Sequence, residues 1–211
     1  MPIATIILAA GSSSRLGEPK QLLRRDDGTT LVRRTAEIAL SLGVGPVVVV
    51  LGANGEDVGH EIADLSLTTA INPDWATGLA SSLQVGLSAL PDIPTDAFLI
   101  LLTDQPHVTA DLLRQLIDVR QSTGRGIVAS RYRTGGSAAF RPAAPAHLGV
   151  PALFDIRYKA EFMTFTDDVG ARKLIRQYSD DCAEVPFPLG AVDLDTPHDV
   201  VNWRSSSTDV V

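Results

Sequence analysis

Short apolar runs rich in isoleucine, valine and leucine recur along the chain, with helical patterns between them. Each run is about as long as a strand buried on both faces of a sheet. The runs cover residues 3–9, 46–51, 68–71, 97–102 and 126–129. Segments 31–42, 80–90 and 110–123 instead repeat apolar residues at helical spacing. Strand and helix therefore alternate, which predicts a single-domain α/β fold of three layers, α/β/α, around a mostly parallel sheet.

The remainder of the chain departs from this alternation. Residues 133–150 contain prolines and the adjacent glycines Gly135 and Gly136, which predict a long loop. A helical pattern returns at 170–178, a β-like run follows at 183–186, and a last helix is expected at 196–203. Thr196 would cap that helix and Pro197 would open it. We expect one domain over residues 1–204 and a frayed tail at 205–211.

The composition excludes several classes of protein. A chain of 211 residues, 45% of them hydrophobic, can bury one sizeable core. Its formal net charge of −7 argues against binding to a nucleic-acid backbone, which requires a basic surface. The apolar run at the start is far too short to span a membrane, and the only cysteine, Cys182, cannot form an internal disulfide. We expect a cytoplasmic protein that binds neither nucleic acid nor membrane.

Ligands of such sheets bind beyond the carboxyl ends of the strands, so we expect the binding site in the loops that leave those ends. Residues 10–20 follow the first strand and contain Gly11, three serines, Arg15 and Lys20. Small residues let backbone N–H groups surround an anion, and the two cations can neutralise phosphates. The loop contains neither a Walker A motif nor a dinucleotide fingerprint. The alternative is a solvated loop with ordinary surface cations.

Carboxylates follow two further segments. Asp104 ends the apolar run 97–102 within the sequence TDQP, and Asp193 alternates with Asp195 just before the last helix. Mg²⁺ usually takes one or two protein carboxylates and completes its shell with water and substrate phosphates. Asp104 could instead serve only to turn the chain, and Asp195 could serve only as a helix cap. Whether Asp193 or Asp195 is the second metal ligand stays open.

Two more segments could contact a ligand. A helix expected to begin near 78–81 would offer free N–H groups and the hydroxyls of Ser81 and Ser82 to an anion or a base. Trp75 is compatible with a core position or with a stacking surface. Arg172 lies within 167–175, which suits an acceptor phosphate or a solvated face. The four histidines show no metal-ligand spacing.

Six motifs in this order resemble the molybdenum cofactor cytidylyltransferase family, within the larger group of MobA-like nucleotidyltransferases. The motifs are LAAGSSSRLGEPKQLL from residue 8, NPDWATGLASSL from 72, TDQP from 103, GVPALF from 149, DVGAR from 168 and DLDTPHD from 193. The resemblance implies a Rossmann-like nucleotidyltransferase fold. It also implies transfer of CMP from CTP to the phosphate of molybdopterin, with release of pyrophosphate and with Mg²⁺ as cofactor. A molybdoenzyme would receive the product.

The resemblance also implies roles for individual residues. Arg15, Lys20 and Asp104 would be catalytic, and Asp104 and Asp195 would hold the metal. The nucleotide would contact Leu8, Ala9, Ala10, Gly11, Arg15, Lys20, Gly78, Ser82 and Thr103. The acceptor would contact Gly149, Pro151, Asp168 and Arg172. In this family an alanine at the position of Ala10 goes with cytosine, whereas guanylyl relatives tend to carry glycine there; TDQP likewise resembles the cytidylyl branch.

Two features depart from the family pattern, and both concern the acceptor side. Asp167 stands where the family usually has glycine, and the loop 133–146 is longer than usual. Three alternatives to cytidylyl transfer to molybdopterin therefore stay open. One is a related transferase that uses GTP or a sugar or polyol phosphate. Another is a non-catalytic protein that binds a nucleotide or cofactor. The third is a nicotinamide-dependent oxidoreductase, which the absent glycine fingerprint disfavours.

Overall fold

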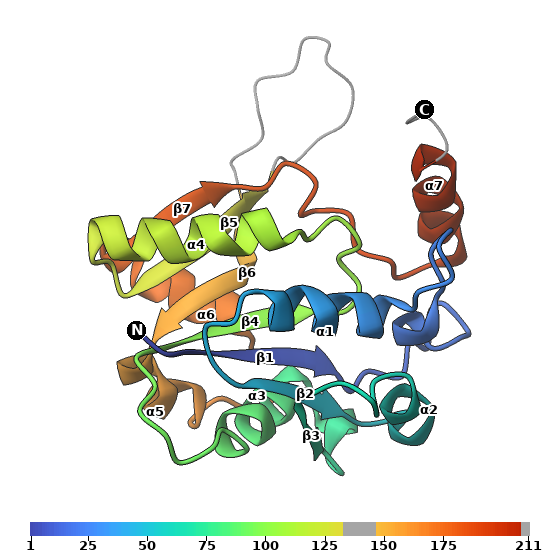
Figure 1. Cartoon of the computed structure of the whole chain (residues 1–211), viewed down its shortest axis with the longest axis horizontal. Helices are drawn as coiled ribbons and strands as arrows, with labels where there is room; N and C mark the ends of the chain where they lie inside the picture. Colours follow the sequence, from blue (N-terminus) through green and yellow to red (C-terminus); the bar gives the residue numbers. More distant parts are fainter. Residues whose placement is uncertain (133–146, 208–211) are drawn as a thin grey trace, which may run out of the picture.

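The computed structural model describes residues 1–132 and 147–207, which form one seven-stranded sheet with helices on both faces (Figure 1). The strands are β1 (Ile3–Ala9), β2 (Val47–Leu51), β3 (Thr68–Ile71), β4 (Ala97–Leu102), β5 (Ile127–Tyr132), β6 (His147–Asp155) and β7 (Cys182–Pro186). Their order in the sheet is β3-β2-β1-β4-β6-β5-β7, and only β6 runs antiparallel to its neighbours. The predicted three-layer, mostly parallel α/β fold is confirmed.

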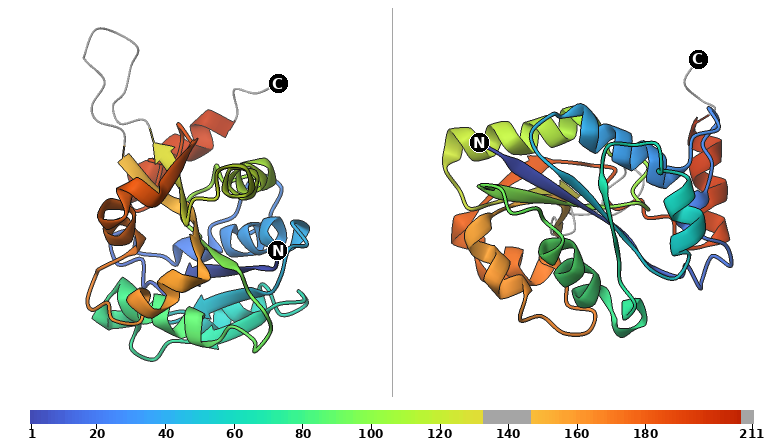
Figure 2. Two further views of the ribbon diagram at one scale, coloured as in Figure 1. Left: turned by 90° about the vertical axis from the view of Figure 1, so that its left-hand side faces the viewer. Right: turned by 60° about the horizontal axis from the view of Figure 1, so that its bottom comes forward.

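The central strands are buried on both faces, as their continuous apolar sequences require. Every residue of β1 and of β2 is buried. Helices α1 (Leu31–Ser41), α2 (Gly55–His60) and α4 (Ala110–Thr123) cover one face, and α3 (Leu79–Ser88), α5 (Lys159–Phe162) and α6 (Ala171–Gln177) cover the other (Figure 2). The sheet therefore divides the apolar interior into two cores.

A third apolar cluster attaches the end of the chain to its beginning. Helix α7 (Pro197–Ser207) packs beside the segment that follows β1 (Figure 1). The cluster consists of Leu16, Leu23, Leu31, Leu194, Val200 and Trp203. Thr196 caps α7 as predicted: its Oγ1 accepts from Asp199 N at 3.3 Å, and the Asp199 carboxylate accepts from Thr196 N at 2.8 Å. The helix continues to Ser207, into the tail expected at 205–211, of which 208–211 lie outside the described residues.

The predicted loop at 133–150 is wrong in its last part, since β6 begins at His147. Residues 133–146 lie outside the described residues. Gly149 and Pro151 concealed the strand, because both weaken an ordinary ladder. In the structure the β5–β6 register shifts between Ala129 and Ser130, and the β4–β6 pairing stops at Ala152. Pro151 therefore occupies an irregular position, where its missing N–H is tolerated.

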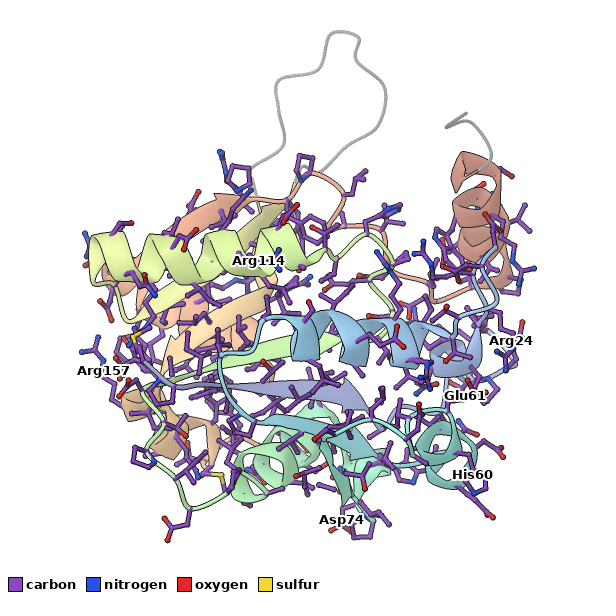
Figure 3. All side chains as sticks on the ribbon, in the orientation of Figure 1. Arg24, His60, Glu61, Asp74, Arg114 and Arg157 are labelled. Carbon is purple, nitrogen blue, oxygen red and sulfur yellow. The ribbon has the colours of Figure 1, made fainter. Side chains whose placement is uncertain are left out.

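Two short helices were not predicted from the sequence. Helices α2 and α5 span six and four residues, too few to show a helical period. Helix α2 is nevertheless held in place at the periphery, where Arg24 donates to Glu61 at 2.8 Å (Figure 3). Within the part of the chain that the structure describes, no helix has the length and apolar character of a membrane span.

Candidate active site

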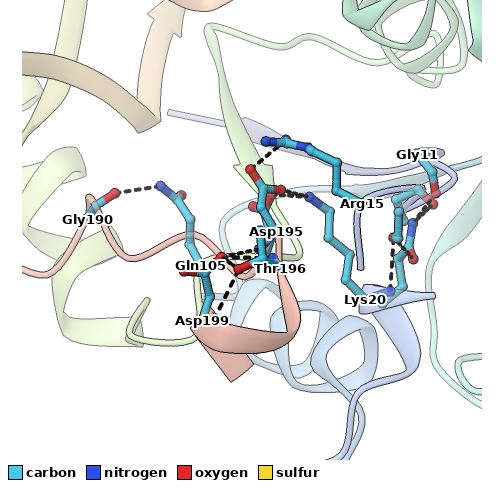
Figure 4. A network of polar contacts seen from close by, with 12 residues as sticks. Gly11, Arg15, Lys20, Gln105, Gly190, Asp195, Thr196 and Asp199 are labelled. Carbon is cyan, nitrogen blue, oxygen red and sulfur yellow. Dashed lines mark hydrogen bonds and ion pairs between the residues drawn. The ribbon is translucent and has the colours of Figure 1, made fainter. Parts of the chain in front are cut away.

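The loops that follow β1 and β4 meet at one edge of the sheet, because these parallel strands are neighbours and end together. Lys20 Nζ lies 2.6 Å from Asp104 Oδ2 and 3.0 Å from Asp195 Oδ1. Arg15 Nη2 lies 2.7 Å from Asp195 Oδ2 (Figure 4). The cations from the first loop thus contact carboxylates from two distant segments, as the expected site requires.

Gln21 fixes the shape of the first loop. Its side chain is buried, and Nε2 donates to the carbonyl oxygens of Ala9 at 3.0 Å and Gly11 at 2.8 Å. Ser13 adopts a left-handed φ of 55°, and its Oγ accepts from Lys20 N at 3.0 Å. These contacts hold the backbone in a tight curve that starts and ends beside β1. Gln21 was not predicted to be part of the site. The available signal was a polar residue beside the apolar pair Leu22 and Leu23.

The acidic segment before α7 is held against the end of β4. Leu194 N donates to the carbonyl oxygen of Asp104 at 3.1 Å, and Leu194 is fully buried. Gln105 Nε2 donates to the carbonyl oxygen of Gly190 at 3.1 Å. One backbone contact and one side-chain contact therefore bring Asp193 and Asp195 near Asp104.

The charges of this site are incompletely balanced. Burial lowers the pKa of Lys20, but attraction to Asp104 and Asp195 outweighs it, so that the pKa is raised and the amine stays protonated. Burial, followed by repulsion from Asp104 and Asp195, raises the pKa of Asp193 to about 6. A buried oxygen of Asp104 and one of Asp193, Oδ1 in each case, lacks a hydrogen-bond partner.

These carboxylates fit a hard divalent cation. Unpartnered carboxylate oxygens are the ligands that Mg²⁺ prefers, and it needs only one or two of them besides water and phosphate oxygens. Across residues 1–132 and 147–207, no three His, Cys, Asp or Glu side chains form a ready metal cage. The arrangement is that of an open site rather than a closed structural one.

A cavity of about 270 Å³ adjoins the carboxylates. Its lining comes from the end of β1 and the first loop, the start of α3 and the residues before it, the end of β4 with the residues after it, and the segment before α6: Leu8, Ala10, Gly11, Lys20, Gln21, Trp75, Gly78, Leu79, Ser82, Leu102, Thr103, Asp104 and Asp168. Seven of the nine residues expected to contact a nucleotide are among them. Ala9 instead packs into the core beneath α1, and Arg15 lies at Asp195, outside the lining.

The start of α3 forms one wall of this cavity. Buried Asn72 donates through Nδ2 to Ser81 Oγ at 2.9 Å and Ser82 Oγ at 3.0 Å, which leaves the Ser82 hydroxyl hydrogen free to donate. Gly78 precedes the helix with φ of 120°. Trp75 is partly buried against the core and also lines the cavity; a stacking role for its ring stays a prediction.

The four residues expected to contact the acceptor fall into two groups. Asp168 lines the cavity just described. Gly149, on β6, and Arg172, on α6, lie instead around Tyr132: the Arg172 guanidinium is 5.9 Å from the ring centroid, and a Cβ at Gly149 would overlap the Tyr132 hydroxyl. Pro151 follows Val150, whose carbonyl oxygen accepts from that hydroxyl. Tyr132 and Gln105 were not singled out from the sequence, where nothing marks them as neighbours.

The fold, the first loop and the paired carboxylates define a protein of the nucleotidyltransferase class. The chain belongs to the family described as the MobA-like NTP transferase domain, whose sequence model matches residues 5–182. It is 32% identical over 182 residues to the nicotine blue oxidoreductase of Paenarthrobacter nicotinovorans, covering 84% of this chain and 83% of that protein. It is 34% identical over 119 residues to the molybdenum cofactor cytidylyltransferase of Escherichia coli, covering 56% of this chain and 59% of that enzyme.

Solved structures agree with this assignment. Rv0371c of Mycobacterium tuberculosis superposes with a TM-score of 0.79 at 28% identity, covering 97% of this chain and 99% of that one. Its complex with manganese superposes with a TM-score of 0.76 at 26% identity, covering 98% of this chain and 100% of that one. A CMP:2-keto-3-deoxy-manno-octonic acid synthetase complexed with CTP, at 13% identity and a TM-score of 0.74, shares the fold; 100% of each chain is covered.

Proposed function

We propose that this protein is a Mg²⁺-dependent nucleotidyltransferase that transfers CMP from CTP to the phosphate of molybdopterin and releases pyrophosphate. One observation carries the proposal. Lys20, on the loop after the first strand, lies between Asp104 and Asp195 and also lines the cavity beside them. Cation, carboxylates and cavity are the parts that bind a metal-bound triphosphate.

The nucleoside of CTP would occupy the cavity, with Ser82 and the backbone at Gly78 close to the base. Its triphosphate would lie along the first loop, where Arg15 and Lys20 supply positive charge. Ala10 and the TDQP sequence support cytosine over guanine, by resemblance to the cytidylyl branch. Similarity to the E. coli cytidylyltransferase, which covers 56% of this chain, supports the same choice.

The reaction is an in-line displacement at phosphorus. An oxygen of the acceptor phosphate attacks the α-phosphorus of CTP, and the bond from the α-phosphorus to the bridging oxygen breaks, so that pyrophosphate leaves. No protein nucleophile is required, because the acceptor oxygen is already anionic. Lys20 and Arg15 offset the charge that develops on the phosphates. Asp104 and Asp195 would hold Mg²⁺, which neutralises phosphate charge when bound.

The acceptor would approach from the side of Arg172, Gly149 and Pro151, with Asp168 at the boundary with the nucleotide. We expect Arg172 to pair with an acceptor phosphate: its guanidinium lies over the Tyr132 ring, and its positive charge also acts on Asp193. A molybdoenzyme would receive the cytidylylated product.

The first experiment measures pyrophosphate release from CTP and from GTP, each with and without molybdopterin, in Mg²⁺ and then in EDTA. The proposal expects release with CTP that requires both pterin and Mg²⁺. Asp104→Asn should abolish release, whereas Asp118→Asn, at an exposed position on α4, should not change it. Pterin-dependent release from GTP alone would contradict the choice of nucleotide. Release that requires a sugar or polyol phosphate would contradict the acceptor.

One relative favours a second candidate function. The nicotine blue oxidoreductase matches over 84% of this chain, so a redox reaction on an aromatic heterocycle is the competing proposal. The first loop lacks the glycine fingerprint of dinucleotide-binding turns, which argues against it. Oxidation of NADH or NADPH with nicotine blue as acceptor separates the two: steady turnover would favour the oxidoreductase.

A further inference from the structure

Tyr132 connects three segments around the acidic site. It ends β5, it is 2% exposed, and its hydroxyl donates to Val150 O on β6. The same hydroxyl accepts from Gln105 Nε2 at 3.1 Å. Gln105 Nε2 also donates to Gly190 O at 3.1 Å (Figure 4). One buried amide therefore ties the end of β4 both to β5 and to the segment that carries Asp193 and Asp195.

The Tyr132 side chain is tightly packed, so its hydroxyl cannot move away from Gln105. A Cβ at Gly190 would overlap the Tyr132 ring, and a Cβ at Gly149 would overlap its hydroxyl. Phe187 contacts the ring edge-on, with centroids 6.2 Å apart. Residues 187–192 then turn twice through backbone hydrogen bonds, from Gly190 N to Phe187 O and from Val192 N to Leu189 O. The position of Gly190 therefore constrains the position of Asp193, because these two hydrogen-bonded turns connect them.

The neighbouring carboxylates need such a connection. Asp104 and Asp195 repel Asp193, and the charges of Arg172 and Lys20 offset this repulsion only in part. Lys20 forms ion pairs with Asp104 and Asp195, so the repulsion favours a movement of Asp193 away from Asp104 that these ion pairs do not directly oppose. Gln105 and the bond from Leu194 N to Asp104 O oppose this movement from both sides of the segment.

We propose that Gln105 and Tyr132 are positioning residues: they form a brace that sets the separation of Asp104 from Asp193 and Asp195, and thereby sets the affinity of the site for a divalent cation. The inference rests on the metal-binding part of the proposed function. It does not depend on the identity of the nucleotide or the acceptor. Residues that orient ligands without touching the metal change metal affinity about 10- to 100-fold when they are replaced.

The test measures Mn²⁺ binding to the whole protein by electron paramagnetic resonance, with thermal unfolding recorded for each variant. Gln105→Leu should weaken Mn²⁺ binding about 10-fold or more. Tyr132→Phe keeps the ring and should weaken it less, because Gln105 still reaches Gly190. The double variant should bind about as well as Gln105→Leu alone, since both changes break one network.

Tyr158→Phe is the matched control. This tyrosine is also buried and also donates its hydroxyl, to Asp181 at 2.6 Å, but it packs in the core on the side of α5 and α6. It removes a buried hydrogen bond and should leave Mn²⁺ affinity unchanged. Equal affinities of wild type and Gln105→Leu would overturn the brace alone. A wild-type chain that binds no Mn²⁺ would overturn both the brace and the magnesium assignment.

Discussion

Lys20 Nζ lies 2.6 Å from Asp104 Oδ2, although 84 positions separate the two residues in the chain. Lys20 follows β1 and Asp104 follows β4, and the two strands run side by side in the same direction. The contact therefore exists because the sheet is parallel at this point. It places a protonated amine between two carboxylates beside the cavity, and the proposed function depends on this arrangement.

Replacing Lys20 by methionine should lower kcat for pyrophosphate release about 100- to 1,000-fold, since a preorganised positive charge is lost where phosphate charge develops. Steady-state kinetics with CTP measures the change. Lys173→Met is the control, because that amine lies 4.9 Å from the Phe165 ring on the outside of α6 and does not line the cavity. Similar rates for the two variants would remove Lys20 from the mechanism.

Replacing Gly78 by alanine should destabilise the fold by about 2–4 kcal/mol. The residue has φ of 120°, and an added Cβ would overlap the backbone of Asp167. Gly28→Ala provides a comparison, since Gly28 also has a positive φ, of 81°, but nothing lies within 4 Å of its would-be Cβ. Urea unfolding of both variants separates the cost of the positive φ, which both positions share, from the cost of the Cβ overlap, which only Gly78→Ala has. A loss no larger than that of Gly28→Ala would mean that this wall of the cavity is not rigid.

Asp167 has φ of 56°, the left-handed conformation that glycine adopts at least cost. This backbone conformation accounts for the glycine that is usual at the position in the family that the sequence resembles. Asp167→Gly should leave the free energy of unfolding within about 1 kcal/mol of the wild type, whereas Asp167→Val should lower it by more than about 1 kcal/mol. Equal stabilities of the two variants in urea would contradict this explanation.

Much of the fold was predictable because buried strands and amphipathic helices differ in period. The runs at Ile3–Ala9, Thr68–Ile71 and Ala97–Leu102 were predicted with the boundaries that the structure has. Strand β6 was not, because Gly149 and Pro151 argue against a strand unless an irregular register accommodates them. Such a register cannot be predicted from the local sequence, because it depends on how the neighbouring strand pairs.

The candidate site was predictable where chemistry and position coincide, as for Lys20 and Asp104. The brace was not, because Gln105 and Tyr132 meet only through the packing of β4 against β6 and of β6 against β5. An uncharged glutamine and a strand-end tyrosine have ordinary structural uses. Their importance comes from two hydrogen bonds of one amide, which only the folded chain shows.

Cys182 should react slowly with thiol reagents at neutral pH. Burial, and next the charge of Glu184, raise the pKa of the thiol from 9.0 to about 11. The reactive thiolate is then about 100-fold scarcer at pH 8 than in an unperturbed thiol. Alkylation by iodoacetamide, followed by mass spectrometry against glutathione, should accelerate up to about pH 11 while the protein stays folded. A rate at pH 8 that equals that of glutathione would contradict the assigned environment.

We propose that this chain transfers a cytidylyl group to a phosphorylated pterin. The most direct measurement incubates the protein with Mg²⁺, molybdopterin and CTP labelled at the α-phosphorus, and follows the label by chromatography and mass spectrometry. We expect the label to appear in a product that contains both CMP and the pterin, about 100- to 1,000-fold more slowly with Lys20→Met and not at all with Asp104→Asn. Label that stays in CTP, while NADH or NADPH is oxidised in the presence of nicotine blue, would rule out cytidylyl transfer as the function.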